Sequence, residues 1–143
     1  MGVSGAISGP AGRVAAVLAA GRLAAGVVSL VAPRGGGWLR PIAAREASAL
    51  GRGLGARDVL LGAGVLRALA AGRGGAEWAW LVVASDLADG AGGATEWRRL
   101  TAAERTWVGA VFALAACEMA VAVALAATNV DNVDVEKAWD ALT

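Results

Sequence analysis

Four stretches of almost entirely apolar residues, each close to the length of a membrane-crossing helix, constrain this chain more than any other feature. They cover residues 14–32, 54–71, 77–94 and 106–128, and Gly-, Pro- and Arg-rich segments separate them. A helix of about 20 residues crosses the ~30 Å hydrocarbon core of a bilayer. No stretch alternates apolar and polar residues with a period of two, so the sequence predicts no strands. It predicts an all-α fold, a four-helix antiparallel bundle.

The first alternative is a soluble four-helix bundle, because each apolar stretch contains at least one charged residue. Composition favours the membrane: 57% of the residues are hydrophobic and 17% charged, against about 45–50% and 25% in soluble domains. The stretches also lack the polar face of a soluble surface helix. Tryptophans lie near their ends, where indole rings rest at lipid headgroups; these are Trp38, Trp78, Trp80, Trp97 and Trp107. We therefore predict a multi-pass integral membrane protein in contact with the lipid bilayer.

The basic residues predict an orientation. No basic residue precedes Arg13, so we expect the first stretch to be retained rather than cleaved as a signal peptide. Arginines are concentrated in the first and third connections, and by the positive-inside rule these connections face the cytoplasm. They are Arg34, Arg40, Arg45 and Arg52, and Arg98, Arg99 and Arg105. Both termini then lie outside. Residue usage rich in Ala, Gly and Arg is typical of a high-GC bacterial genome, which indicates a bacterial cytoplasmic membrane.

Ionisable residues inside the apolar stretches are the most informative ones for function. A central Arg or Asp costs about 2.5–3.5 kcal/mol to insert, whereas each Leu, Ile, Val or Phe returns only about 0.3–0.6 kcal/mol. Such residues are therefore expected to pair with one another or to mark a functional site. The candidates form a predicted intramembrane charge network of Arg22, Arg57, Asp58, Asp86, Asp89 and Glu118.

Their depths predict the pairs. At 1.5 Å per residue, Arg22, Asp86 and Glu118 lie at nearly one depth in an antiparallel bundle. We expect Arg22 to pair with Asp86 or Glu118, and Arg57 to pair with Asp89 or with neighbours on its own helix. Two interpretations stay open: ion pairs that only set how the helices pack, or a substrate, ion or proton site.

Other chemistry has less support. Asp58, Asp86 and Asp89 could together hold Mg²⁺ through oxygen ligands. However, the chain lacks the Asp-Gly, Ala-Arg and spaced-aspartate motif of membrane enzymes that transfer phospho-alcohols. The sequence contains no histidine, and Cys117 is the single cysteine, so no disulfide forms within one chain. No catalytic residue and no cofactor is indicated.

Several short patterns predict local structure. Small residues at Gly51-xxx-Gly55, Gly62-Ala-Gly64 and Gly109-xxx-Ala113-xxx-Cys117 favour close contact between helices. Thr101-Ala-Ala-Glu104 has the spacing of a capping box and predicts a helix start. Residues 129–143 form an acidic tail in which an apolar stripe predicts a short amphipathic helix; the stripe consists of Val135, Ala138, Trp139 and Leu142.

Several of these pieces together resemble a group of small four-span membrane proteins of high-GC bacteria, loosely similar to DoxX-like proteins. The matching segments are 22–30 (RLAAGVVSL), 44–46 (ARE), 55–62 (GARDVLLG) and 85–89 (SDLAD). The resemblance covers about residues 14–94 and implies a four-span fold in the membrane. The group has no agreed activity, so it implies nothing about mechanism.

The sequence thus favours a non-enzymatic function, in which the chain is an accessory or interaction subunit of a homo-oligomer or a larger membrane complex. The alternative is a small-molecule or proton-coupled transporter that uses Asp86, Asp89 and Glu118. A metal-dependent membrane enzyme is the third interpretation. Nucleic-acid binding is not expected, because 13 basic and 12 acidic residues leave a net charge of only +1.

Overall fold

Four α-helices make up nearly all of the computed structural model, which describes residues 9–32 and 44–140 and the side chains of 9–32 and 49–128. The helices are α2 (Pro10–Val31), α3 (Ala44–Ala71), α4 (Gly75–Thr95) and α5 (Ala102–Asp140), with a 3₁₀ turn, η2 (Trp97–Arg99), before α5. No strand occurs within the described ranges. The all-α, four-helix expectation is confirmed for this part of the chain.

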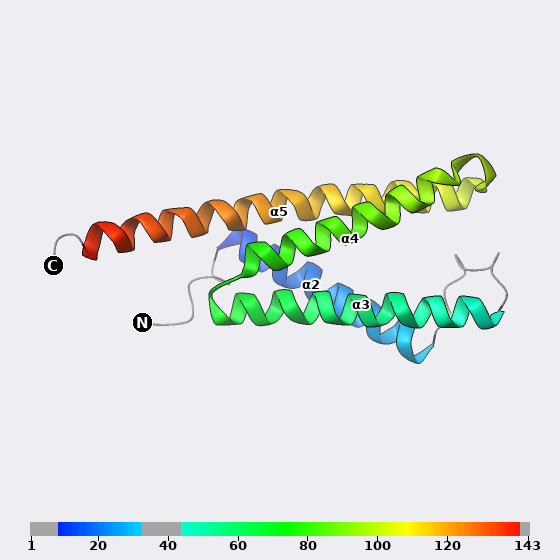
Figure 1. Ribbon diagram of the computed structural model, residues 1–143, viewed down its shortest axis with the longest axis horizontal. Coiled ribbons are helices and arrows are strands. Elements are labelled where there is room, and N and C mark those ends of the chain that lie inside the picture. Colours follow the sequence, from blue (N-terminus) through cyan, green and yellow to red (C-terminus); the bar gives the residue numbers. More distant parts are fainter. Residues whose placement is uncertain (1–8, 33–43, 141–143) are drawn as a thin grey trace.

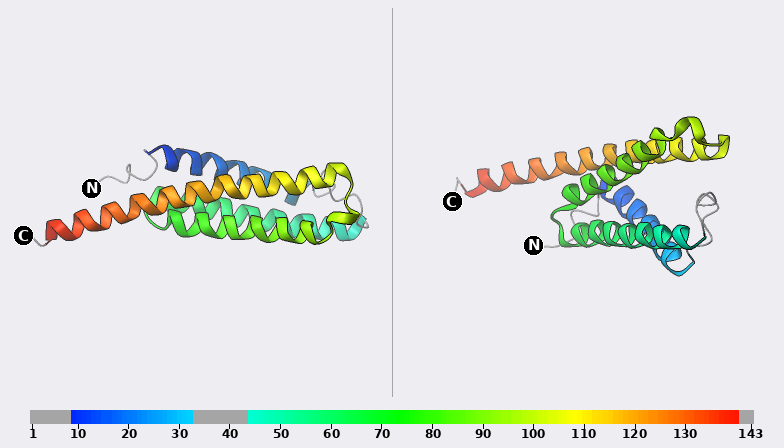
Figure 2. Two further views of the ribbon diagram at one scale, coloured as in Figure 1. Left: turned by 90° about the horizontal axis from the view of Figure 1, so that it is seen from above. Right: turned by 45° about the vertical axis from the view of Figure 1, so that its right-hand side comes forward.

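Two helices extend beyond the apolar stretches that predict them. α3 begins at Ala44, so the polar approach and the second apolar stretch form one helix. α5 continues to Asp140 without a break. Residues 129–140 are therefore helical as expected, but they continue α5 rather than forming a short helix of their own. Leu142 lies outside the described residues. The C-terminal part of α5 projects beyond the other three helices (Figures 1 and 2).

Successive helices run in opposite directions and form two hairpins (Figure 1). α2 packs chiefly against α3, and α4 packs chiefly against α5. Glycines allow α2 and α3 to approach closely: a Cβ added at Gly55 would lie 2.7 Å from the carbonyl oxygen of Gly26, and one at Gly62 would lie 2.7 Å from that of Ala19. The predicted close packing at Gly55 and Gly62 is confirmed.

The connections between helices use the residues that their geometry requires. Gly72 and Gly74 have φ angles of +67° and +75°, a left-handed conformation that glycine adopts without steric cost. At the start of α5, the Thr101 amide donates to Glu104 Oε2 over 2.7 Å, and the Glu104 amide donates to Thr101 Oγ1 over 3.4 Å. The predicted capping box is confirmed.

The interior is filled mainly by small side chains. Five of the nine residues in the main buried cluster are alanines; the cluster is Ala15, Ala19, Val65, Leu69, Ala76, Ala79, Val82, Ala122 and Leu125. Many large apolar side chains instead lie on the outside, among them Val17, Val28, Leu60, Leu81, Phe112 and Val123. Small side chains therefore pack in the interior, and large apolar side chains cover the outside.

Two of the described helices are long and apolar enough to cross a membrane, namely α2 and the Ala102–Thr128 part of α5. α3 and α4 do not meet the same criterion. By length and composition, two of the four helices are thus candidate membrane spans, and this criterion does not show four.

Candidate functional site

The side chain of Arg22 lies at the centre of the fold and bonds one carboxylate from each of the other three helices. Its Nη1 donates to Asp58 Oδ1 of α3 over 3.0 Å. Its Nη2 donates to Asp86 Oδ2 of α4 over 2.5 Å and to Glu118 Oε1 of α5 over 2.9 Å. One guanidinium thus joins all four helices.

A second arginine extends the network toward the surface. Arg57 Nη1 lies 2.8 Å from the Asp89 carboxylate of α4, and Arg57 Nη2 donates to Asp58 Oδ1 over 3.2 Å. Asp58 therefore accepts from both arginines. We call these six residues, Arg22, Arg57, Asp58, Asp86, Asp89 and Glu118, the charge network.

The two ends of the charge network differ in burial. The side chains of Arg22, Asp86 and Glu118 are only 9%, 6% and 7% exposed, whereas those of Arg57 and Asp89 are 31% and 39% exposed. Buried charges need both a counter-charge and hydrogen bonds to offset their lost hydration. The inner end meets this need almost entirely within the chain, while the outer end is partly open.

One carboxylate oxygen in the inner end has no partner. Glu118 Oε2 is buried and makes no hydrogen bond, and the same holds for Arg57 Nε. Four carboxylates face two guanidinium groups, so the fully ionised charge network carries a formal charge of −2. The site therefore has both an uncompensated negative charge and an unused acceptor.

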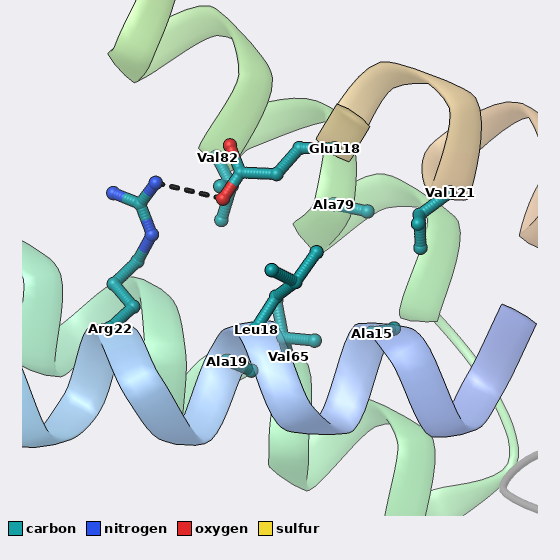
Figure 3. A pocket seen from close by; sticks show the side chains of 9 residues that line it. All are labelled: Ala15, Leu18, Ala19, Arg22, Val65, Ala79, Val82, Glu118 and Val121. Atoms are coloured by element: carbon teal, nitrogen blue, oxygen red, sulfur yellow. Dashed lines mark hydrogen bonds and ion pairs between the residues drawn. The ribbon is translucent and has the colours of Figure 1, made fainter. Parts of the chain in front are cut away.

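A small pocket adjoins the inner end (Figure 3). Arg22 and Glu118 are its charged members, and its other lining residues are apolar: Ala15, Leu18, Ala19, Val65, Ala79, Val82 and Val121. Its volume of about 20 Å³ suffices for one water molecule, which needs about 10–15 Å³ on the same measure. An organic substrate does not fit.

The structure confirms the predicted pairs and adds one. Arg22 bonds both Asp86 and Glu118, the two partners that the equal depths predict. Arg57 bonds Asp89 and its neighbour Asp58, again both of the predicted choices. The bond between Arg22 and Asp58 was not predicted, because the two residues differ in depth. The length of the arginine side chain closes that difference.

The three aspartates of the predicted magnesium site are bonded to arginines and are not arranged around an open centre. Asp58 and Asp86 both bond Arg22, and Asp89 bonds Arg57. The guanidinium groups therefore occupy the positions that a cation would need. Across residues whose side chains are described, no three acidic or sulfur-bearing side chains form a group that could hold a metal ion.

Two predictions about packing surfaces need correction. Gly109, Ala113 and Cys117 lie exposed on α5 and make no close helix contact within the chain. Trp78 packs against Gly64 rather than lying fully at the surface. A uniformly apolar helix does not reveal from its sequence which face turns inward, and the chain uses the opposite face of α5.

The remaining aromatic positions agree with an interfacial location. Trp80, Trp97 and Trp107 are large exposed residues near helix ends. The Arg105 guanidinium lies over the Trp97 ring, 5.7 Å from its centre. Trp38 lies outside the described residues.

Glu104, in the cap of α5, lies outside the predicted apolar stretches, and the fold shifts its pKa. Hydrogen bonds donated by the Thr101 hydroxyl and amide to Glu104 lower the pKa of this exposed carboxyl. The carboxylate is thereby favoured at the start of the helix, where the positive end of the helix dipole also lies.

Comparison of the chain with protein-family models, with curated proteins and with solved structures found no match. The resemblance to DoxX-like proteins therefore stays a prediction, and the functional argument rests on this chain's own residues.

Proposed function

We propose that this chain is a multi-pass integral membrane protein whose four helices cross a bacterial cytoplasmic membrane together. The observation that carries the proposal is the inverted distribution of polarity. Asp86 and Glu118 are buried, while large apolar side chains cover the outside. Water-soluble proteins can also bury paired charges, but they rarely expose large contiguous apolar patches. In lipid, charges face the bundle interior and apolar groups face the acyl chains.

The charge network also bears on whether α3 and α4 cross the membrane. Exposed Arg67 in α3 and exposed Glu77 in α4 lower the hydropathy of these helices, and so do four further residues, Arg57, Asp58, Asp86 and Asp89. All four side chains belong to the charge network and have ionic partners within the chain. A helix whose charges are neutralised by its neighbours costs less to insert than its composition indicates. This supports four spans rather than two.

We further propose a non-enzymatic role as an accessory or interaction subunit, in a homo-oligomer or beside a larger membrane protein. The inner charged groups bond one another, and the adjoining pocket has a volume of only about 20 Å³. This pocket is too small for an organic substrate, which favours a non-enzymatic role. The chain has a long apolar exterior, and its internal ion pairs join the four helices.

Fractionation tests the membrane location. The full chain should stay in the membrane pellet after a carbonate wash and should need detergent for extraction. Recovery of a monodisperse, detergent-free soluble species would refute the membrane proposal.

Native mass spectrometry of the detergent-extracted complex tests the accessory role. The expected result is a fixed stoichiometry, either of several copies of this chain or of this chain with one larger membrane protein. A monomer under the mildest extraction that preserves other complexes of the same membrane would contradict it.

The second candidate is a small-molecule or proton-coupled transporter, favoured by the excess of carboxylates in the charge network. Reconstituted in liposomes with an imposed pH gradient, the wild-type chain would then carry protons faster than Glu118→Gln. Equal flux through wild type, Glu118→Gln and protein-free liposomes would remove this candidate and leave the accessory role intact.

A further inference from the structure

The inner end of the charge network has more negative than positive groups. Arg22 is the one cation among three side chains that are all more than nine-tenths buried, and it faces both Asp86 and Glu118. The second cation, Arg57, bonds Asp58 and Asp89, at the more exposed end. Two buried carboxylates therefore share one guanidinium, and both of them bond the same nitrogen, Nη2.

Carboxylates that share one site do not both ionise readily, because each disfavours the negative charge of the other. Glu118 adds a second reason. One of its oxygens, Oε2, is buried without any donor, and a buried acceptor that carries negative charge and no hydrogen bond is costly. Protonation on Oε2 removes that charge and leaves Oε1 free to accept from Arg22.

A small pocket adjoins the Glu118 side chain. Glu118 lines it, and it has room for one water molecule. Figure 3 shows the Glu118 side chain reaching from α5 across to Arg22 at one end of this pocket. Oε2 itself is buried, so proton exchange with this pocket requires a small movement of the carboxyl group.

The geometry favours a proton over a metal ion. Hard cations take about six to eight oxygen ligands around an open centre. Here the guanidinium of Arg22 occupies the centre, bonding Asp58, Asp86 and Glu118. A proton needs one free oxygen, and Glu118 Oε2 is such an atom.

We infer that Glu118 forms a proton-binding site beside Arg22 and Asp86, with one exchangeable proton on its carboxyl group inside the bundle. Binding joins one proton from water to Glu118 Oε2 and converts a carboxylate to a neutral carboxyl, with no other bond broken. The groups facing this site are Arg22 of α2, Arg57 and Asp58 of α3, and Asp89 of α4. The site depends neither on the accessory role nor on movement of the proton across the membrane.

Infrared difference spectroscopy of the detergent-solubilised full chain tests the site. Exposed Asp and Glu, with ordinary pKa values of about 3.9 and 4.3, are ionised above about pH 6. The wild-type chain should nevertheless show the carbonyl band of a protonated carboxyl near pH 6, and the band should be lost as the pH rises. Glu118→Gln should lack the titrating glutamate band, while Glu77→Gln, at an exposed glutamate, should keep it.

Isotope labelling keeps the test decisive if Glu118→Gln fails to fold. The wild-type chain is prepared with ¹³C-carboxyl glutamate in one sample and ¹³C-carboxyl aspartate in another. A shift of the band in the glutamate sample supports the inference, whereas a shift only in the aspartate sample would contradict it. A spectrum without any protonated-carboxyl band above about pH 6 would overturn the inference, even if the chain proves to be an integral membrane protein.

Discussion

Replacement of Arg22 by leucine should destabilise the chain more than any other single loss of charge in the described bundle. The substitution removes the donor of three hydrogen bonds, to Asp58, Asp86 and Glu118. Asp58 keeps its bond to Arg57, but Asp86 and Glu118 lose their ionic partner. Breaking a buried pair by removing one partner typically costs about 3–5 kcal/mol. That cost corresponds to a shift of roughly 10²- to several 10³-fold in the folding equilibrium.

A control variant separates the loss of the Arg22 ion pairs from the general effect of replacing an arginine on this helix. Arg13→Leu, at an exposed position in the first turn of the same helix, should change the stability by no more than about 0.5 kcal/mol. A triple variant, Arg22→Leu with Asp86→Asn and Glu118→Gln, should recover at least half of the loss, because it leaves neither buried carboxylate without a counter-charge.

The assay is reversible unfolding in mixed micelles, followed by circular dichroism, with the free energy of unfolding extrapolated to zero denaturant. If Arg22→Leu unfolds at the same denaturant concentration as Arg13→Leu, the charge network does not stabilise the fold. If the triple variant is no more stable than Arg22→Leu alone, the loss comes from packing rather than from unpaired charge.

Three further outcomes are expected. Gly55→Ala should lower the free energy of unfolding by about 1–3 kcal/mol through overpacking against α2, whereas Gly53→Ala, with nothing within 4 Å of its added Cβ, should raise it by up to about 1 kcal/mol through helix propensity. Because the fold lowers the pKa of Glu104, its contribution to the cap is complete above the ordinary pKa and is lost as the pH falls through the lowered value. Hydrogen-exchange protection at the start of α5, taken relative to the intrinsic exchange rate at each pH, should fall over that acidic range, and Glu104→Gln should abolish the dependence. In a Cys117→Ala background, a cysteine at Arg73 should react with a membrane-impermeant thiol reagent in intact cells and one at Arg98 only after permeabilisation; the reverse pattern would invert the proposed orientation.

The sequence predicts most of the inner site because helix geometry relates residue number to depth. Arg22, Asp86 and Glu118 lie near the centres of three apolar stretches, so an antiparallel bundle places them at one level. The high cost of a lone charge in lipid then requires them to meet. Both premises can be derived from residue positions alone, and the observed bonds agree with them.

What could not be predicted depends on helix rotation. In α5 apolar residues surround the whole circumference, so hydrophobic periodicity does not indicate an inward face. The small residues Gly109, Ala113 and Cys117 favour one face, yet Glu118 is the residue turned inward. The small residues Ala115 and Ala122 are buried too, and Glu118, the one charge in the apolar stretch 106–128, bonds Arg22. The position of Glu118 was the better signal for the rotation of α5.

Close helix contacts at small residues occur together with buried ion pairs in this fold. The glycines at Gly55 and Gly62 bring α3 against α2 at backbone distance, so the arginine projecting from α2 is long enough to bond carboxylates on three other helices. With larger residues at those contacts, the helices would lie farther apart and one guanidinium would not reach all of them. The low hydropathy of α3 and α4 follows from the same arrangement, since their aspartates serve as partners for arginines. In the proposed membrane arrangement, a helix that forms ionic contacts with its neighbours fails a test of hydropathy for each helix alone, although many large apolar side chains lie on the outside of the bundle. The number of spans is therefore better estimated after the internal ion pairs have been assigned than before.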